Sequence, residues 1–330
     1  MNYFEHTNLS PSSINLYNTK VIKWISFMPE EKKDILHIIL HPDEATTCLV
    51  RQLDNTNPTN LHMYYSAIVT FLNHASYLSI LLHPLTLLTL KEKWYKIRDD
   101  NQIPILQKRL QNKPTALQEQ KGGTKLTYAD ILTKRDSLTT GSIAKLLLGF
   151  YTFLPPVRAD YHCVQILKGE QEANTANYIR FVNDDTVICV LTDFKTAKKY
   201  KRIENQIPAP LLHELRTSLQ EQPRDYLFVN QGNKPFTRNA FTVWSKRILS
   251  KLFDTEFTLV IIRHLFLSSL DYNKLTTENL IEIGSKMGHS IQTQRDYKWN
   301  KTEAEAEVDE TEDGLEMDDS QTKNVVIHVK

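Results

Sequence analysis

The chain has 330 residues, of which 41% are hydrophobic and 24% are charged, a balance typical of a globular protein with one or two cores. Its longest apolar stretches, such as residues 77–90, are interrupted well short of the roughly 18 residues needed to span a bilayer. The N-terminus also lacks the basic and apolar regions of a signal peptide, so we expect an intracellular protein without a membrane segment. Three separated cysteines, without a CxxC pair, offer no zinc site: Cys48, Cys163 and Cys189.

The net charge of +1 conceals an uneven distribution along the chain. Residues 303–320 contain ten acidic residues and no lysine or arginine. Residues 1–302 therefore hold 38 lysines and arginines, the total of 40 less Lys323 and Lys330, against 29 acids, a net charge of +9. A basic body suits a polyanionic partner such as DNA, although many basic proteins bind none.

Residues 1–98 are expected to form a small helical domain. Ser12 and Ser13 can cap a first helix whose apolar residues repeat at helical spacing. Later amphipathic stretches predict further helices, the last of them after an Asn-Pro-Thr turn: 35–40, 45–53 and 61–82. The role of this domain stays open between a clamp on a DNA duplex and a plain helical bundle.

Residues 99–127 are polar, contain two prolines and a Gly-Gly pair, and predict a linker between domains. Residues 128–301 are expected to form a second domain that is mainly α-helical with a small antiparallel β-sheet. The expected strands are 178–182, 186–192 and 201–208, the first two joined by an Asn-Asp-Asp turn. The expected helices are 143–154, 209–220, 239–252, 259–270 and 277–286.

Residues 302–330 are expected to be an acidic, disordered tail, because they carry too little apolar material to offset the entropy of ordering. One hypothesis is that this tail competes with DNA for the basic body of the protein. Its last apolar stretch, NVVIHV at 324–329, either docks on a neighbouring protomer or frays.

Four clusters in the second domain carry residues that could perform chemistry. They are PPVRADY at 155–161, DFKTAKKYK at 193–201, IIRHLF at 261–266 and MGHSIQTQRDY at 287–297. Each alone is commonplace, as a surface arginine, a solvated lysine or a Gly-His helix cap. The sequence contains no glycine-rich phosphate loop and no recognisable Ser-His-Asp arrangement, so nothing points to ATP or to a serine hydrolase.

Taken in this order, the clusters resemble the tyrosine recombinase (integrase) family over residues 10–299. The family's order is an arginine at a helix end, a lysine on a β-hairpin, His-x-x-Arg on a later helix, a Gly-His, and a tyrosine nucleophile shortly after it. The residues within these motifs look most similar to those of the recombinases of large DNA viruses and related mobile elements. The resemblance implies a helical core-binding domain, a mixed α/β catalytic domain, and breakage and rejoining of DNA without a cofactor or a metal.

Arg158 and Arg263 are the expected phosphate-binding cations. Attack of a tyrosine oxygen on a phosphodiester places extra negative charge on the nonbridging oxygens, so fixed cations must already point at them. Arginine presents planar, paired donors that match two phosphate oxygens, and it stays charged throughout.

Lys195 is the expected general acid. The departing 5′ oxygen needs a proton, and a lysine on a mobile hairpin can supply it. Lys198, Lys199 and Lys201 lie close by, but Lys195 falls where the family's hairpin lysine does, before a threonine at the end of a strand.

Tyr297 is the expected nucleophile, and the resemblance implies that His289 donates a hydrogen bond to a nonbridging oxygen. A phosphotyrosine bond would preserve the energy of the broken phosphodiester, which explains strand exchange without a cofactor. His289 follows Gly288, so a purely capping role is compatible with the same position.

The sequence departs from the family at Val260, three residues before Arg263, where the family often has a histidine. Valine cannot accept a proton, so the tyrosine proton must go to water, to another side chain or to the scissile phosphate. His264 is expected to point to a different helix face and to pack rather than to substitute for the missing histidine. Asp160 either orients Arg158 or caps the next segment.

The expected partner is double-stranded DNA, held by a homotetramer, because strand exchange in this family needs two duplexes cut in turn. Two other functions remain open. The first is a type IB topoisomerase, which uses the same tyrosine chemistry as a monomer to relax supercoils. The second is a DNA-binding protein that descends from a recombinase and has lost catalysis, which valine at position 260 would reflect.

Overall fold

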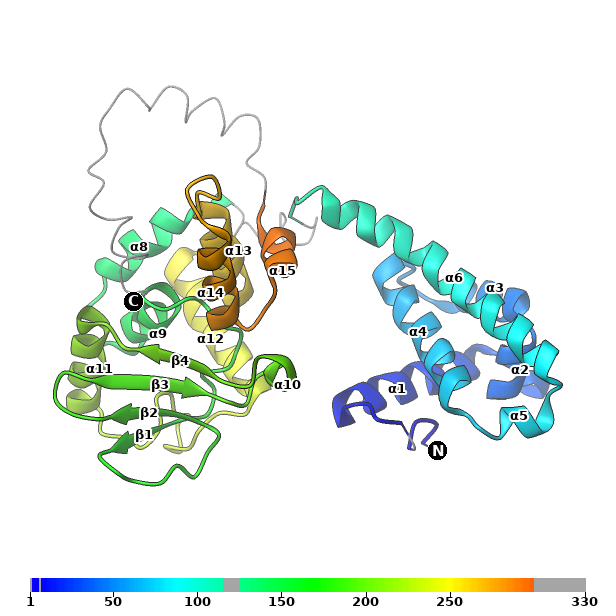
Figure 1. Cartoon of the computed structure of the whole chain (residues 1–330), viewed down its shortest axis with the longest axis horizontal. Coiled ribbons are helices and arrows are strands. Elements are labelled where there is room, and N and C mark those ends of the chain that lie inside the picture. Colours follow the sequence, from blue (N-terminus) through cyan, green and yellow to red (C-terminus); the bar gives the residue numbers. More distant parts are fainter. Residues whose placement is uncertain (1, 6, 115–124, 300–330) are drawn as a thin grey trace, which may run out of the picture. The chain divides into compact units, whose positions relative to one another are not determined.

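The computed structural model describes residues 2–5, 7–114 and 125–299, and the chain divides into two compact units, Met1–Gln111 and Asn112–Lys330 (Figure 1). Each unit has its own hydrophobic core. The expectations for the acidic tail and for residues 324–329 lie outside the described residues. No helix in the described part of the chain combines the length and apolarity that crossing a membrane requires.

Helices are the only regular secondary structure among the described residues of unit 1. Its elements are α1 (Pro11–Phe27), the 3₁₀ turn η1 (Glu30–Lys32), α2 (Ile35–Leu40), α3 (Pro42–Gln52), α4 (Pro58–His74), α5 (Leu78–Leu81) and α6 (Pro84–Leu110). Proline stands at the first helical position of four of them, where its missing N–H would have no partner in any case. The helix expected over 61–82 is thus two helices, because the chain leaves the helical conformation at Ala75.

The boundary between the two units falls after Gln111, inside the segment expected to be a linker. Residues 99–110 of that segment are nevertheless helical, since α6 continues through Pro104 to Leu110. A proline lacks one helical hydrogen bond and predicts a break, but here the helix carries on past it.

Two tryptophans organise the core of unit 1. Trp24 on α1 and Trp94 on α6 are both fully buried, with ring centroids 5.6 Å apart in an edge-to-face arrangement. Each indole N–H is satisfied by a main-chain carbonyl at 3.1 Å, that of Ala45 for Trp24 and that of Ile39 for Trp94. The core therefore joins α1 and α6 to the short helices α2 and α3.

Unit 2 combines helices with one small sheet. Its elements are α8 (Tyr128–Asp136), α9 (Ile143–Thr152), β1 (Val164–Lys168), β2 (Asn177–Phe181), β3 (Val187–Leu191), α10 (Ala197–Tyr200), β4 (Ile203–Gln206), α11 (Ala209–Glu221), α12 (Arg238–Phe253), α13 (Leu259–Ser269), α14 (Thr277–Met287) and α15 (Ile291–Tyr297). The chain is thus mainly α-helical with a small sheet, as expected.

The sheet has the order β1-β2-β3-β4 (Figure 1). Strands β2, β3 and β4 are antiparallel, as the hairpin pattern predicts. Strand β1, which was not expected, pairs in parallel with β2, so the sheet is mixed rather than purely antiparallel. Helix α14 packs against β4, and α13 contacts both α8 and α15, which brings the last helices of the chain to the end of the sheet where α10 interrupts the β3–β4 connection.

Candidate active site

Arg263 lies at the centre of the candidate site. It sits in the middle of α13, on a helix whose apolar neighbours are buried, and its own side chain is 0% exposed. Its Nη1 donates to the main-chain carbonyl of Pro156, which ties it to the segment before Arg158. Its Nε and Nη2 are buried and have no hydrogen-bond partner among the residues that the structure describes. Buried donors are seldom left unsatisfied, so these two N–H groups are available to an anion.

The electrostatic surroundings of Arg263 also suit an anion. Burial lowers the pKa of Arg263 to about 10, and the nearby positive charge of Arg158 acts in the same direction, while Tyr297 opposes the shift. Arg263 therefore remains charged near neutral pH, in a place where a positive charge is poorly solvated. A negative group that entered the site would relieve that cost.

Tyr297 is the last residue of α15 and faces Arg263. The guanidinium carbon of Arg263 lies 5.2 Å from the centroid of the Tyr297 ring. The His289 ring lies nearly parallel to the same ring, with centroids 6.1 Å apart and an interplanar angle of 9°. The structure therefore brings together three of the side chains that were expected in the site.

His289 follows the C-cap of α14, where Gly288 adopts a left-handed conformation with φ of 66°. Its main-chain N–H donates to the carbonyl of Gly284 at 2.9 Å, so the helix-capping role is present. Its Nδ1 lies 3.3 Å from the carbonyl oxygen of Ser290, which can only accept, so the proton is placed on Nδ1. The buried Nε2 has no partner in the described residues and, in a neutral ring, offers a lone pair.

His289 is neutral in the free protein. Burial, with the positive charge of Arg263 as the next cause, lowers the pKa of His289 to about 3. A neutral ring with its proton on Nδ1 can accept a proton at Nε2, and it can donate there only after it has become charged.

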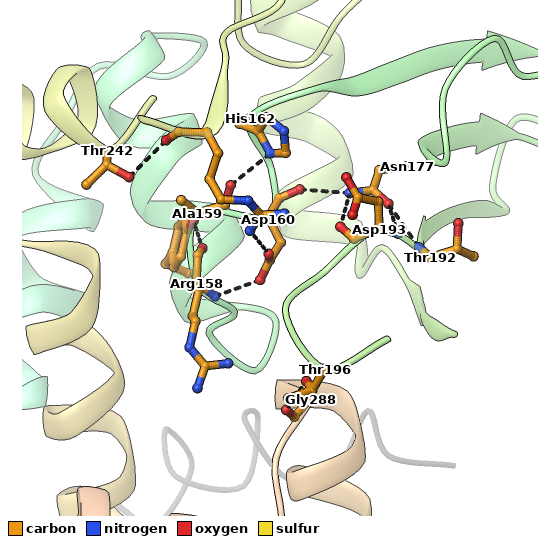
Figure 2. A network of polar contacts seen from close by, with 12 residues as sticks. Arg158, Ala159, Asp160, His162, Asn177, Thr192, Asp193, Thr196, Thr242 and Gly288 are labelled. Carbon is orange, nitrogen blue, oxygen red and sulfur yellow. Dashed lines mark hydrogen bonds and ion pairs between the residues drawn. The ribbon is translucent and has the colours of Figure 1, made fainter. Parts of the chain in front are cut away.

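Arg158 follows α9 on a segment whose main chain is held by hydrogen bonds. Its N–H donates to the carboxylate of Asp160 at 3.1 Å, and its carbonyl accepts from the hydroxyl of Tyr151 (Figure 2). The other oxygen of Asp160 pairs with Arg238, the first residue of α12. Asp160 thus fixes the backbone at Arg158 and not its guanidinium, which extends away from these bonds in Figure 2. Arg238 was not foreseen, since nothing local in the sequence relates it to a residue 78 positions away.

Lys195 lies on the connection from β3 to α10, and its side chain is exposed. The residues on both sides of it contact Gly288: Thr196 donates from Oγ1 to the Gly288 carbonyl at 2.6 Å, and a Cβ at Gly288 would meet the Phe194 ring at 3.2 Å. The segment that carries Lys195 is therefore docked on the turn that carries His289, as Figure 2 shows for Thr196 and Gly288. The other three candidate lysines lie on α10 or at its end: Lys198, Lys199 and Lys201.

Val260 cannot serve as a base and is 42% exposed on the first turn of α13. His264 packs, as expected, but its partner is Tyr297 itself. Its Nδ1 lies 2.6 Å from the main-chain carbonyl of Tyr297, and its ring stacks on those of Tyr297 and Trp299, with centroids 4.6 and 4.3 Å away. Burial lowers the pKa of His264 to about 4, so it is neutral. The main-chain N–H of Trp299 donates to Ser268 Oγ at 2.8 Å, so the residues after Tyr297 are also held against α13.

Comparison with known proteins finds neither a matching family model nor a matching curated protein. Solved structures do resemble the chain. A crystal structure of XerA recombinase is 14% identical, with a TM-score of 0.39 over 96% of this chain and 97% of that one. The XerH site-specific recombinase bound to difH substrate in a pre-cleavage complex is 13% identical, with a TM-score of 0.38 over 91% and 96%. The post-cleavage complex of XerH with palindromic difH is 13% identical, with a TM-score of 0.37 over 93% and 97%. All three of these neighbours are Xer recombinases.

Proposed function

We propose that this chain is a tyrosine recombinase, which cuts and rejoins double-stranded DNA through a covalent bond between Tyr297 and the 3′ phosphate. One observation carries the proposal. Arg263 is fully buried, faces the Tyr297 ring, and keeps two N–H donors without a partner among the described residues, beside an equally unpartnered His289 Nε2. A phosphodiester supplies the oxygens that these groups lack.

The two arginines bind the phosphate and stabilise its transition state. Arg263 donates from Nε and Nη2 to nonbridging oxygens, and Arg158 adds a second cation from a backbone held by Asp160. Burial first, and then repulsion by the positive charge of Arg158, lowers the pKa of Arg263. The anionic phosphorane-like state offsets that repulsion, which makes the cations more effective in the transition state than in the free protein.

Proton transfer completes the reaction. The Tyr297 oxygen attacks phosphorus, the bond from phosphorus to the 5′ oxygen breaks, and Lys195 protonates that oxygen as it leaves. With valine at position 260, we assign the acceptor of the tyrosine proton to His289 Nε2, because the phosphate anion bound beside it raises the pKa of that ring above its value of about 3 in the free protein. Once charged, His289 donates to a nonbridging oxygen, the role that the family resemblance implies for it.

The rest of the chain fits the same activity. The helical unit 1 is the natural clamp on the duplex, and the net charge of +9 over residues 1–302 favours binding to the DNA backbone. A homotetramer on two DNA sites, and an origin in a large DNA virus or a related mobile element, belong to the proposal through the resemblance of the motifs.

The test is covalent trapping of the protein on nicked suicide substrates. These substrates are made from DNA fragments of the genetic element that encodes the protein. Wild-type protein should form protein-linked DNA on a denaturing gel, and Tyr297→Phe should form none. Tyr272→Phe is the matched control, because Tyr272 is a second partly buried tyrosine near α15 whose ring lies under Lys298. If wild type binds DNA but forms no adduct on any fragment, the protein is a non-catalytic binder. An adduct with relaxation of supercoils by a monomer and without strand exchange would indicate a topoisomerase.

A further inference from the structure

Asn177, the first residue of β2, is a buried amide with four hydrogen bonds to main-chain atoms. Its side chain is 2% exposed. Its Nδ2 donates to the carbonyls of Asp160 and Asp193, at 3.1 and 3.0 Å. Its Oδ1 accepts from the N–H groups of Thr192 and Asp193, at 2.9 and 2.8 Å. Both donors and both lone pairs of the amide are therefore used (Figure 2).

These four bonds join two segments that carry proposed site residues. Asp160 is two residues after Arg158, and Asp193 is two residues before Lys195. Figure 2 shows Asn177 between the Arg158 segment and the end of β3. One side chain thus sets the spacing between the backbone at the phosphate-binding arginine and the backbone that leads to the lysine.

The Lys195 segment has a second anchor on its other side. Thr196 donates from Oγ1 to the carbonyl of Gly288, the residue before His289. Lys195 therefore stands between two fixed points, while its own long side chain is exposed and free to reach a substrate. Loss of either anchor would widen the range of positions that the ammonium group samples.

We propose that Asn177 is a positioning residue that holds Lys195 in place, relative to Arg158, for protonation of the departing 5′ oxygen. The inference rests on the proposed recombinase function. Aspartate lacks the two donors, serine and alanine cannot span the gap, and glutamine would carry the same amide one methylene farther from the backbone. Without Asn177 the Arg158 backbone keeps its bonds to the Asp160 carboxylate and the Tyr151 hydroxyl, so the effect should fall mainly on the step in which a proton reaches the leaving group.

A DNA strand with sulfur in place of the bridging 5′ oxygen isolates this step. The Tyr297 oxygen attacks phosphorus, the phosphorus–sulfur bond breaks, and the sulfur leaves with the bonding electrons as a thiolate. A thiolate is a much weaker base than an alkoxide and leaves without a proton, so this reaction needs no general acid. A defect in the acid or in its position disappears on this substrate, whereas a defect in folding, DNA binding or phosphate binding stays.

The experiment compares cleavage rates on oxygen and sulfur substrates, with the sulfur placed at the position that the wild-type adduct maps. On the oxygen substrate, the cleavage rate should fall by about 100-fold or more in Lys195→Ala and by about 10-fold or more in Asn177→Ala. Both should return to within a few-fold of wild type on the sulfur substrate. Asn205→Ala is the matched control, because Asn205 is another buried asparagine of the same sheet, on β4, and should show no difference between the substrates.

Thr196→Val tests the same idea without disturbing the sheet. It removes only the hydrogen bond to Gly288, and we expect a smaller oxygen-specific defect that sulfur also corrects. A loss of rate in Asn177→Ala that is equal on both substrates would overturn the inference, as would an unchanged rate. If Asn177→Ala fails to fold, Asn177→Asp decides by the same criterion, because aspartate keeps the two acceptors and loses the two donors. Failure of the proposed function looks different, because wild type would then form no adduct on either substrate and both proposals would fall together.

Discussion

His264 and Tyr297 are joined twice, by a hydrogen bond of 2.6 Å from His264 Nδ1 to the Tyr297 main-chain carbonyl and by stacked rings with centroids 4.6 Å apart. The histidine follows Arg263 directly, so α13 presents both the buried cation and the support for the proposed nucleophile. The hydrogen bond fixes the end of α15, and the stacking fixes the orientation of the phenol ring.

His264→Phe should keep the stacking and lose the hydrogen bond. A neutral hydrogen bond contributes about 1 kcal/mol, so we expect adduct formation to slow by roughly fivefold while DNA affinity is unchanged. His264→Ala removes both contacts and should slow it further. Single-turnover trapping beside a binding titration measures the two effects, and a loss of affinity without a loss of rate would contradict this role.

The stability of unit 2 should fall as the pH drops below about 6.5. His264 and His289 have pKa values of about 4 and about 3 in the folded protein, below the usual value of 6.5 in an unfolded chain. The unfolded state therefore binds more protons, so their contribution is fully present above about pH 6.5 and is lost as pH falls through the two folded values. Between these limits each histidine should remove up to about 1.4 kcal/mol per pH unit.

Urea unfolding of wild type and of His264→Phe, at about pH 7 and about pH 5, measures this dependence. Carboxylates titrate in both proteins, so the comparison isolates the histidine. The variant should lose less stability between the two conditions than wild type does. Equal losses in the two proteins would mean that His264 is not held neutral by the fold.

Arg263→Lys should fold and should lose activity. Lysine keeps a positive charge but cannot supply Nε and a second Nη to two phosphate oxygens, and burial lowers the pKa of its amine. Loss of one preorganised donor costs about 100-fold or more in rate, so the adduct should fall by at least that factor. Arg247→Lys, an exposed arginine on α12, is the matched control and should react within a few-fold of wild type.

Substitution of Asp160 and substitution of Arg238 should lower the free energy of unfolding by different amounts. The Asp160 side chain is 5% exposed and that of Arg238 is 39% exposed, so the arginine can be hydrated without its partner and the carboxylate cannot. We expect Arg238→Met to cost about 1 to 3 kcal/mol in the free energy of unfolding and Asp160→Asn to cost less, because asparagine keeps an oxygen for the Arg158 N–H. Denaturant titration of both variants gives the order, and the reverse order would refute the argument.

Periodic apolar residues made much of the second unit predictable. Helices α9 and α11 to α14 lie where their apolar stripes predict them, and the β2–β3 hairpin closes around the Asn-Asp-Asp turn. Strand β1 was missed because five residues without strict alternation carry little signal. Helix α6 was missed as a whole: no helix was expected over 84–98, and beyond residue 98 Pro104 and a polar composition predicted a linker.

The supports of the site were less predictable than its reactive residues. Arg158, Lys195, Arg263, His289 and Tyr297 stand in motifs that can be recognised locally. Asn177 and Arg238 act through partners that are distant in sequence, and an asparagine at the start of a strand or an arginine at the start of a helix is common in any protein. Such contacts follow from the tertiary fold, which single-sequence patterns do not contain.

Both sides of Tyr297 are tied to α13 of its own chain, through His264 at the Tyr297 carbonyl and through Ser268 at the Trp299 N–H. The proposed nucleophile therefore lies beside Arg263 of the same chain, and we expect it to act there rather than in a neighbouring molecule. Mixing Tyr297→Phe with Arg263→Ala should consequently restore no adduct, since neither protein can complete the other. In genetic terms, we expect that the two mutations would not complement each other in a cell that makes both proteins.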